Sequence, residues 1–247
     1  MKDAARRIIE AIGSQGRVTV MTGAGISAES GISTFRDRGG LWEKYSVEEV
    51  ATPEAYAANP SRVHEFYNMR RAHLGTVQPN EGHRALVRLE RLFGDSFTLI
   101  TQNVDDLHER AGSRRVLHMH GELYKARCVE CFEVVEWMGD ISLDDGCRSC
   151  SGAMRPHIVW FGEVPFFMEE EIPDACDGCA VFFSIGTSGT VYPAAGLASM
   201  VRAGGGLCVE INLETTPGSG IFQLQIEGKA GEQLPLLLGE LEALVGA

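Results

Sequence analysis

The fold is decided by residues 17–28, which read Arg17-Val18-Thr19-Val20-Met21-Thr22-Gly23-Ala24-Gly25-Ile26-Ser27-Ala28. A short β-type run ends directly in a glycine turn, which is typical of a strand that leads into a helix. The turn fits the pattern G-x-G-x-x-G/A, whose small residues let backbone amides approach a pyrophosphate. A dehydrogenase-type site also needs an acidic residue at the end of a second strand. Residues 31–42 instead form a polar loop with no strand before Asp37, so hydride transfer is disfavoured.

Three later apolar runs end as abruptly as the first. Residues 97–100 lead into Thr101-Gln102-Asn103-Val104-Asp105, residues 181–185 into Gly186-Thr187-Ser188, and residues 207–211 into Asn212-Leu213-Glu214. Buried apolar strands that alternate with helices predict an α/β fold with a parallel sheet. Ligands of such sheets bind beyond the carboxyl ends of the strands, so we expect the four polar clusters to converge on one crevice.

Helical spacing of apolar residues predicts three helices around these strands. They cover residues 2–12, 61–74 and 80–93. Ser61, which follows Pro60, is a candidate N-cap for the second of them.

Four of the seven cysteines have the spacing of a metal site. Cys128-x2-Cys131 and Cys147-x2-Cys150 are separated by 15 residues, which is typical of a four-thiolate zinc site. Four thiolates leave no open coordination position, so the zinc is expected to fold a small insert rather than to take part in catalysis. The alternative is four unligated thiols. Cys176 and Cys179 form a further pair without a distant partner pair, which favours packed thiols.

His118 and His120 come close behind the cluster of residues 102–105 and lie two residues apart. On an extended segment both side chains face the same side, so both can reach the crevice, or packing can hold one of them back. The sequence alone does not choose between these arrangements.

Tyr67 and Arg70 lie three residues apart on the predicted helix of residues 61–74. A guanidinium fork beside a phenol hydroxyl is a good receptor for a carboxylate. Arg71, four residues after Tyr67, is the alternative partner on that face. The alternative is a solvated arginine beside a half-buried tyrosine.

Composition and charge narrow the class of protein further. The 247 residues carry 22 Lys and Arg against 34 Asp and Glu, and this net charge of −12 disfavours phosphate-backbone binding as the main activity. The sequence contains no apolar run of membrane-spanning length, and its first 16 residues lack the pattern of a secretory signal. We therefore expect a cytoplasmic protein without a membrane segment or a sequence-specific nucleic-acid partner.

Taken together and in order, these motifs resemble the sirtuin family over nearly the whole chain. They are residues 23–27 and 101–105, His120-Gly121, the two cysteine pairs, Val159-Trp160-Phe161-Gly162-Glu163, residues 186–188 and residues 212–214. Ala51-Thr52-Pro53, residues 59–63 and Tyr67-x2-Arg70 further resemble class III of that family, which is associated with acidic acyl-lysine substrates as well as acetyl-lysine.

The resemblance implies a Rossmann-like domain with an inserted small zinc-binding domain. Residues 1–40, 75–120 and 155–247 would form the discontinuous NAD-binding domain. Residues 41–74 would form a helical part of the small domain, and residues 121–154 its four-cysteine zinc-binding part. NAD and an extended acyl-lysine peptide would bind in the cleft between the domains, and we expect a monomer.

The resemblance also implies which residues bind NAD. The cofactor-binding residues would be Gly23, Ala24, Gly25, Ile26, Ser27, Phe35, Arg36, Trp42, Gln102, Asn103, Val104, Asp105, Gly186, Thr187, Ser188, Asn212, Leu213, Glu214 and Ala230. The first eight would hold the pyrophosphate and close over the nicotinamide end. The Gln102–Asp105 group would contact the nicotinamide ribose and carboxamide, and the last seven would hold the adenosine half.

Substrate contacts and the catalytic base follow in the same way. Val159, Phe161, Gly162 and Glu163 would form a strand that pairs with the peptide backbone, and Tyr67 and Arg70 would bind the acyl group. After the acyl oxygen has displaced nicotinamide, His120 would act as general base on a ribose hydroxyl. The products would be nicotinamide, free lysine and O-acyl-ADP-ribose. The four cysteines would hold the structural zinc.

Two other functions fit part of the same pattern. A mono-ADP-ribosyltransferase would use the same NAD site with a protein nucleophile, and would yield ADP-ribosylated protein. A non-catalytic module would only bind NAD or a peptide, and it is disfavoured because His120, Asn103 and Asp105 occupy the matching positions.

Overall fold

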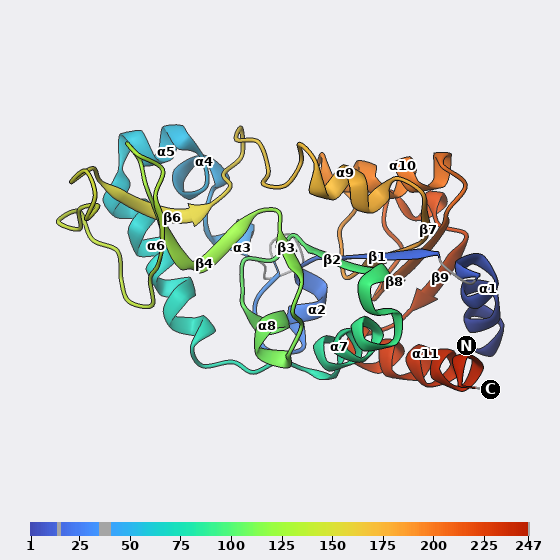
Figure 1. Cartoon of the computed structure of the whole chain (residues 1–247). Helices are drawn as coiled ribbons and strands as arrows, with labels where there is room; N and C mark the ends of the chain where they lie inside the picture. The colour runs from blue at the N-terminus through green and yellow to red at the C-terminus, as the bar shows by residue number, and fades with distance from the viewer. Residues whose placement is uncertain (14–15, 35–40, 247) are drawn as a thin grey trace.

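The structure, a computed structural model, describes residues 1–13, 16–34 and 41–246, without the side chains of Trp42 and Glu43. Two units lie next to each other in Figure 1, a large α/β unit on the right and a smaller unit on the left. Each unit has its own sheet, and the chain passes between them several times, so that both units are built from discontinuous segments.

The large unit is built on a six-stranded sheet in the order β3-β2-β1-β7-β8-β9, in which all neighbouring strands are parallel. The strands are β1 Arg17–Thr22, β2 Phe97–Thr101, β3 Val116–His118, β7 Cys179–Ile185, β8 Leu207–Asn212 and β9 Leu224–Glu227. The four central strands are those predicted from the apolar runs, so the predicted parallel sheet is confirmed. The edge strands β3 and β9 were not predicted, because they are short and only partly buried.

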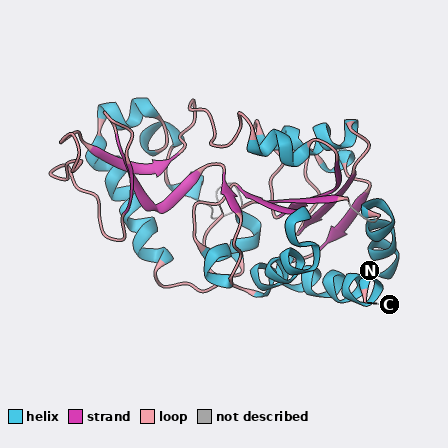
Figure 2. Ribbon diagram, viewed as in Figure 1, coloured by secondary structure: helices cyan, strands magenta, loops and turns pink. Residues whose placement is uncertain are grey.

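Helices cover both faces of this sheet, as Figure 2 shows. On one face lie α1 Lys2–Ile12, α7 Glu81–Phe93 and α11 Ala230–Val245, and on the other α9 Glu171–Cys176 and α10 Leu197–Ala203. The α7 and α11 helices bury leucines against β1 and β7 in one apolar cluster, and α10 packs on the opposite face in a second. The sheet is therefore buried on both faces, as expected for parallel strands.

The smaller unit combines helices with an antiparallel sheet in the order β5-β4-β6. Its strands are β4 Gly121–Cys128, β5 Val134–Glu136 and β6 Met154–Ile158, and its helices are α4 Val47–Val50, α5 Pro53–Ala58 and α6 Pro60–Leu74. Short helices α2 Ala24–Ala28, α3 Leu41–Lys44 and α8 Leu107–Ala111 lie in the connections. The exact domain bounds stay a prediction.

Helix α6 begins one residue earlier than predicted. Asn59 is its N-cap and accepts a hydrogen bond from the backbone N–H of Arg62 at 3.0 Å, while Pro60 takes the first helical position. The prediction of Ser61 as N-cap is therefore wrong. Proline is well suited to the first position because it has no N–H that would need a partner.

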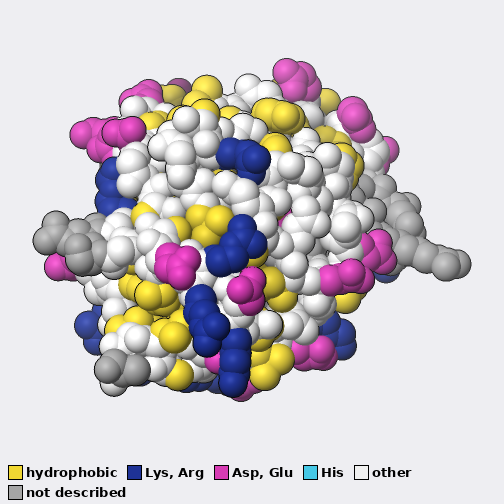
Figure 3. All heavy atoms as spheres, turned by 90° about the vertical axis from the view of Figure 1, so that its right-hand side faces the viewer, with side chains coloured by type: hydrophobic (Ala, Val, Ile, Leu, Met, Phe, Trp, Pro, Cys, Tyr) yellow, Lys and Arg dark blue, Asp and Glu magenta, His cyan; other side chains and the backbone are white. Residues whose placement is uncertain are grey.

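The surface beyond α1 carries mixed charges. Figure 3 shows Lys and Arg side chains near the middle of this face, interrupted by acidic and apolar side chains. Such a face offers no continuous basic track for a phosphate backbone. Among the described residues, no helix has the length and apolar character needed to cross a membrane.

Candidate functional site

A cavity of about 990 Å³ lies between the two units, at the carboxyl ends of β1, β2, β7 and β8. The predicted convergence of the four polar clusters on one crevice is confirmed. From the predicted cofactor set, the lining includes Gly23, Ala24, Gly25, Gln102, Asn103, Val104, Gly186, Thr187, Ser188, Asn212, Leu213, Glu214 and Ala230. From the predicted substrate and catalytic set, it includes Tyr67, Arg70, His120, Val159, Phe161, Gly162 and Glu163.

Three residues of the predicted cofactor set lie behind the cavity wall instead of lining it. They are Ile26, Ser27 and Asp105, and all three are buried. Phe35, Arg36 and the side chain of Trp42 lie outside the described part of the chain.

Two glycine turns interlock at the floor of the cavity. The N–H of Gly25 donates to the carbonyl of Gly186 at 2.9 Å, so the turn after β1 rests on the turn after β7. A Cβ on Gly25 would lie 2.7 Å from the Cα of Gly186. Gly186 has φ 61°, where glycine is favoured, and a Cβ there would lie 2.6 Å from the backbone nitrogen of Ile26. The glycines are thus needed for this close backbone approach.

The side chain of Asn103 is fixed by the first of these turns. Its amide nitrogen donates to the carbonyl of Gly23 and to the hydroxyl of Ser27, each at 3.1 Å. Ser27 in turn donates to the carboxylate of Asp105 at 3.0 Å. Burial raises the pKa of Asp105. This hydrogen-bonded group holds the β1 and β2 strand ends together and leaves Asn103 at the cavity surface.

His120 is oriented by a backbone carbonyl. Its Nδ1 lies 3.1 Å from the carbonyl oxygen of Gln102, which can only accept, so Nδ1 carries the proton. In the neutral ring Nε2 then holds the free lone pair. Burial lowers the pKa of His120, although the hydrogen bond to Gln102 opposes this effect. The arrangement favours a neutral imidazole that lines the cavity and is able to accept a proton through Nε2.

His118 has a different environment from His120, and packing holds it back from the cavity. Its Nε2 lies 2.8 Å from a carboxylate oxygen of Glu109, and its Nδ1 lies 3.2 Å from the carbonyl oxygen of Asn103. Burial alone would lower the pKa of His118, but the hydrogen bond and charge of Glu109 outweigh it and raise the pKa. The structure therefore separates the two histidines that the sequence left equivalent.

Tyr67 and Arg70 share one face of α6 and both line the cavity. The guanidinium carbon of Arg70 lies 5.6 Å from the centre of the Tyr67 ring and 5.5 Å from that of Phe66. Burial lowers the pKa of Arg70, while Tyr67 and Asp105 oppose this effect. Arg71, the alternative at the next position, donates to the carbonyl of Leu123 and to Asn68 instead.

The segment after β6 turns instead of continuing as a strand. β6 ends at Ile158, and the N–H of Glu163 donates to the carbonyl of Trp160, so the predicted strand over residues 159–163 is wrong. The carboxylate of Glu163 accepts from both terminal nitrogens of Arg155, at 2.7 and 3.0 Å, and from the N–H of Trp160 at 2.8 Å. These side-chain hydrogen bonds stabilise the turn. Strand propensity read from the sequence cannot reveal them.

Several lining residues were not predicted from the sequence. Trp160, Tyr192 and Lys229 are the largest of these. Lys229 and Trp160 are each next to a predicted site residue in the sequence, and this position could have indicated them. Tyr192 lies six residues after Gly186, and no pattern in the sequence indicated it. Its side chain is 78% exposed at the cavity wall.

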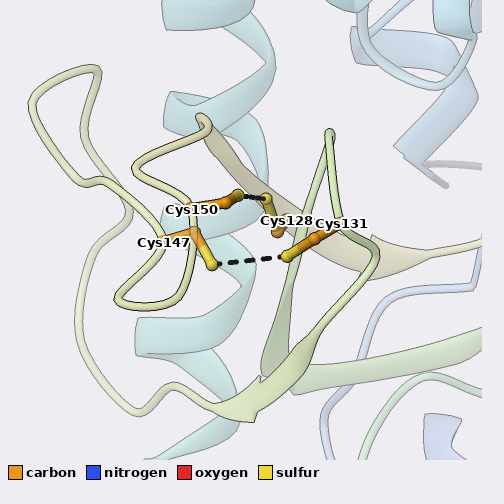
Figure 4. Close-up of side chains that lie close together, drawn as sticks. All are labelled: Cys128, Cys131, Cys147 and Cys150. Atoms are coloured by element: carbon orange, nitrogen blue, oxygen red, sulfur yellow. Dashed lines mark hydrogen bonds between the residues drawn. The ribbon is translucent and has the colours of Figure 1, made fainter.

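The four predicted metal ligands come together in the smaller unit, as Figure 4 shows. All four sulfur atoms lie within 4.8 Å of one another, and the Cys128–Cys150 and Cys131–Cys147 pairs are 3.4 and 3.6 Å apart. Tetrahedral zinc with Zn–S bonds of about 2.3 Å requires sulfur separations of about 3.8 Å. Backbone N–H groups of Glu130, Ser149 and Gly152 also donate to three of the sulfurs. The donor set and its spacing fit one structural zinc ion.

Cys176 and Cys179 are not part of such a cluster. Both are buried in the apolar core between α9, α10 and the large sheet. Within the described residues, the only group of three or more His, Cys, Asp and Glu side chains close enough to hold a metal is the four-cysteine cluster. The prediction of packed thiols is confirmed.

The fold and the cavity define a Rossmann-like α/β protein with a four-cysteine module beside its ligand cleft. The Sir2 family model matches residues 23–193. The chain belongs to the Sir2 family, the sirtuins. NAD-dependent protein deacylases from Shewanella oneidensis and Pasteurella multocida are 50% and 51% identical to it, each over 92% of this chain and over 94% and 98% of their own length.

Solved structures agree with this assignment. A Sir2 homologue in complex with NAD has a TM-score of 0.89 at 40% identity, covering 97% of this chain and 94% of that chain. A Sir2 protein bound to a myristoylated histone peptide has a TM-score of 0.76 at 33% identity, covering 100% and 99%. The expected family and fold are therefore confirmed.

Proposed function

We propose that this chain is an enzyme that consumes NAD to remove acyl groups from lysine side chains of proteins. The observation that carries the proposal is the position of His120, whose ring opens on the same cavity as the glycine turns and the Tyr67–Arg70 pair. A cavity of about 990 Å³ lies at the upper end of the range for ligand pockets, which suits a dinucleotide together with an acyl-lysine chain. The deacylase name of relatives about 50% identical supports the same reaction.

NAD would occupy the part of the cavity formed by the strand ends of the large sheet. Gly23, Ala24 and Gly25 leave the backbone accessible to the pyrophosphate. The side-chain nitrogen of Asn103 already makes two hydrogen bonds, so Asn103 offers its amide oxygen to the nicotinamide half. At the other end, Asn212 donates to the carbonyl of Thr187, which joins the β7 and β8 turns beside the adenosine half. When bound, NAD supplies the electrophilic ribose carbon. Ser27 and Asp105 act indirectly, by fixing Asn103.

His120 would be the general base. The carbonyl of Gln102 fixes the proton on Nδ1, and burial lowers the pKa of the ring, so Nε2 is free to take a proton from a ribose hydroxyl near neutral pH. His118 does not fit this role, because both of its nitrogens already face acceptors. The zinc is expected to fold the module beside the cleft, and we assign it no part in the chemistry.

The acyl group would lie against Tyr67 and Arg70. A guanidinium and a phenol hydroxyl that line one cavity match a terminal carboxylate. We therefore propose that succinyl- and malonyl-lysine are substrates beside acetyl-lysine. Glu163 would contribute to peptide binding only through the backbone of its turn, because Arg155 and Trp160 already occupy its carboxylate.

The direct test is a set of peptides that differ only in their acetyl, malonyl or succinyl group, incubated with NAD and analysed by mass spectrometry. Wild type should deacylate them and His120→Asn should not. His73→Asn is the matched control, because His73 is exposed on α6 away from the cavity lining. If the two variants lose activity equally, His120 is not the base.

The same spectra separate the mono-ADP-ribosyltransferase alternative. That enzyme would increase the mass of a protein acceptor and leave the acyl-peptide intact. The names of the similar curated relatives do not favour it.

A further inference from the structure

One hydrogen bond fixes the direction in which the Tyr67 hydroxyl points its proton. The indole Nε1 of Trp160 lies 3.1 Å from the Tyr67 oxygen. An indole nitrogen can only donate, so the phenol oxygen must be the acceptor of this bond. Among the described residues, the hydroxyl makes no other hydrogen bond. Its own proton therefore remains available for an acceptor in the cavity.

Two sets of contacts hold the indole of Trp160 in place. The guanidinium carbon of Arg155 lies 3.3 Å from the centre of the Trp160 ring, which is a close cation–π stack. The same guanidinium binds Glu163 with two parallel hydrogen bonds, and Glu163 accepts the backbone N–H of Trp160. Both the ring and the backbone of Trp160 are thus held by one ion pair.

The three side chains of this arrangement are buried, which strengthens the polar interactions between them. Tyr67 and Trp160 are each 2% exposed, and the side chain of Arg155 is 8% exposed. In a buried site a hydroxyl that accepts one hydrogen bond becomes a better donor in the next, because the bonds polarise one another. Arg70, beside the Tyr67 ring, adds a positive charge at the same end of the cavity.

We propose that Trp160 is a positioning residue for acyl selectivity, because its indole N–H orients the Tyr67 hydroxyl to donate to a carboxylate at the end of the acyl chain. The proposal rests on the deacylase function and adds a determinant that does not itself touch the carboxylate. Arg155 and Glu163 support it by holding the indole. A phenylalanine at position 160 would keep an aromatic ring on Arg155 but leave the Tyr67 proton free to point either way.

The test is a double-mutant cycle with the full chain, using Trp160→Phe, Tyr67→Phe and the combined variant. KM and kcat are measured at saturating NAD on succinyl- and acetyl-lysine peptides of one sequence. Trp160→Phe should lower the succinyl-to-acetyl ratio of kcat/KM about three- to tenfold, mainly through the succinyl KM, the range for one hydrogen bond. In the Tyr67→Phe background the same substitution should change that ratio less than about twofold, because the acceptor is already gone.

Three results would overturn the proposal. They are equal losses on both peptides, additive losses in the combined variant, and no effect of Tyr67→Phe on the succinyl KM. Absence of any deacylation by wild type would instead reject the underlying function. The thermal midpoint of each variant, measured by circular dichroism, reports whether it is folded.

Two further variants guard against a folding defect in Trp160→Phe. Benzothienylalanine at position 160 keeps the shape of the indole and removes only its N–H, and it should reproduce the effect of phenylalanine. Tyr56→Phe is the matched control. The Tyr56 ring lies 5.2 Å from that of Trp160, but its hydroxyl donates to the carbonyl of Met154, outside the cavity lining, so it should leave the ratio unchanged.

Discussion

The Nδ1 atom of His120 lies 3.1 Å from the carbonyl oxygen of Gln102, and this contact determines which ring nitrogen can act as a base. Gln102 belongs to the polar cluster that ends β2, and the N–H of Val159, which directly follows β6 of the smaller unit, donates to the carbonyl of His120. The base is therefore fixed by backbone groups next to β2 and next to β6, at the junction of the two units.

This environment gives a pH dependence with a definite sign. Burial lowers the pKa of His120 from its usual 6.5, so the base is neutral and active above that lowered value. We expect kcat/KM to rise with pH along a limb whose midpoint lies below 6.5 and then to level off. A pH series on an acetyl-lysine peptide measures this limb. A midpoint above 6.5 would argue against a buried, neutral His120.

Replacement of Arg70 should change the choice of acyl group. Arg70→Met removes the charge beside Tyr67, and a charge-assisted hydrogen bond contributes about 1.5–3 kcal/mol, so the succinyl-to-acetyl ratio of kcat/KM should fall roughly ten- to hundredfold. Arg62→Met is the control, because Arg62 lies on the same helix with its side chain 43% exposed in a pair with Glu65. Equal ratios in wild type and Arg70→Met would exclude a carboxylate contact.

Metal removal should unfold the four-cysteine module. A chelator, or Cys150→Ser, should abolish the single bound zinc detected by native mass spectrometry and lower the thermal midpoint, because the thiolates lose the metal ion that joins them. Cys176→Ala should retain one zinc, since Cys176 is buried in a separate core. Full zinc occupancy in Cys150→Ser would contradict the four-thiolate assignment.

The glycine interlock should not tolerate a side chain. Gly186→Ala would place a Cβ 2.6 Å from the backbone nitrogen of Ile26 at a φ of 61°. We expect a loss of about 1–3 kcal/mol in the free energy of unfolding and a higher KM for NAD. Gly139→Ala is the matched control, because a Cβ there meets no atom within 4 Å. Unchanged NAD kinetics in Gly186→Ala would show that the two glycine turns can shift apart to accommodate a side chain.

The pair of His118 and Glu109 should stabilise the fold at low pH. The pKa of His118 is raised above 6.5, so its charged form favours the folded state. That stabilisation is complete below 6.5 and disappears as the pH rises through the higher folded value. Urea unfolding of wild type and Glu109→Gln should therefore differ most just below pH 6.5 and converge at high pH. A constant difference across the pH series would rule out titration of His118 as the cause. Glu136→Gln is the control, because Glu136 lies at an exposed site.

The sequence was sufficient for the features that depend on local pattern. The four central strands are buried on both faces, so they appear as apolar runs, and each polar cluster at a strand end marks the cavity directly. The cysteine pairs likewise reveal the metal site through spacing alone. The short edge strand β9 gives no such signal, because its side chains are only partly buried.

Other features depend on contacts between distant parts of the chain. The distinction between His118 and His120 is made by Glu109 on α8, which no spacing rule connects to either histidine. Trp160 and Tyr67 are 93 residues apart in the sequence, and their hydrogen bond exists only because the turn after β6 packs on α6. The sequence placed both residues in motifs, but the bond between them required the structure.

The stoichiometry of one reaction tests the proposed function most directly. Wild type, NAD and a succinyl-lysine peptide are incubated together, and nicotinamide, free-lysine peptide and O-succinyl-ADP-ribose are quantified by mass spectrometry. We expect the three products in equal molar amounts. With His120→Asn we expect neither free-lysine peptide nor O-succinyl-ADP-ribose, because His120 acts after nicotinamide has been displaced. Release of nicotinamide by wild type without free-lysine peptide, or transfer of ADP-ribose to protein in its place, would contradict the assignment as a deacylase.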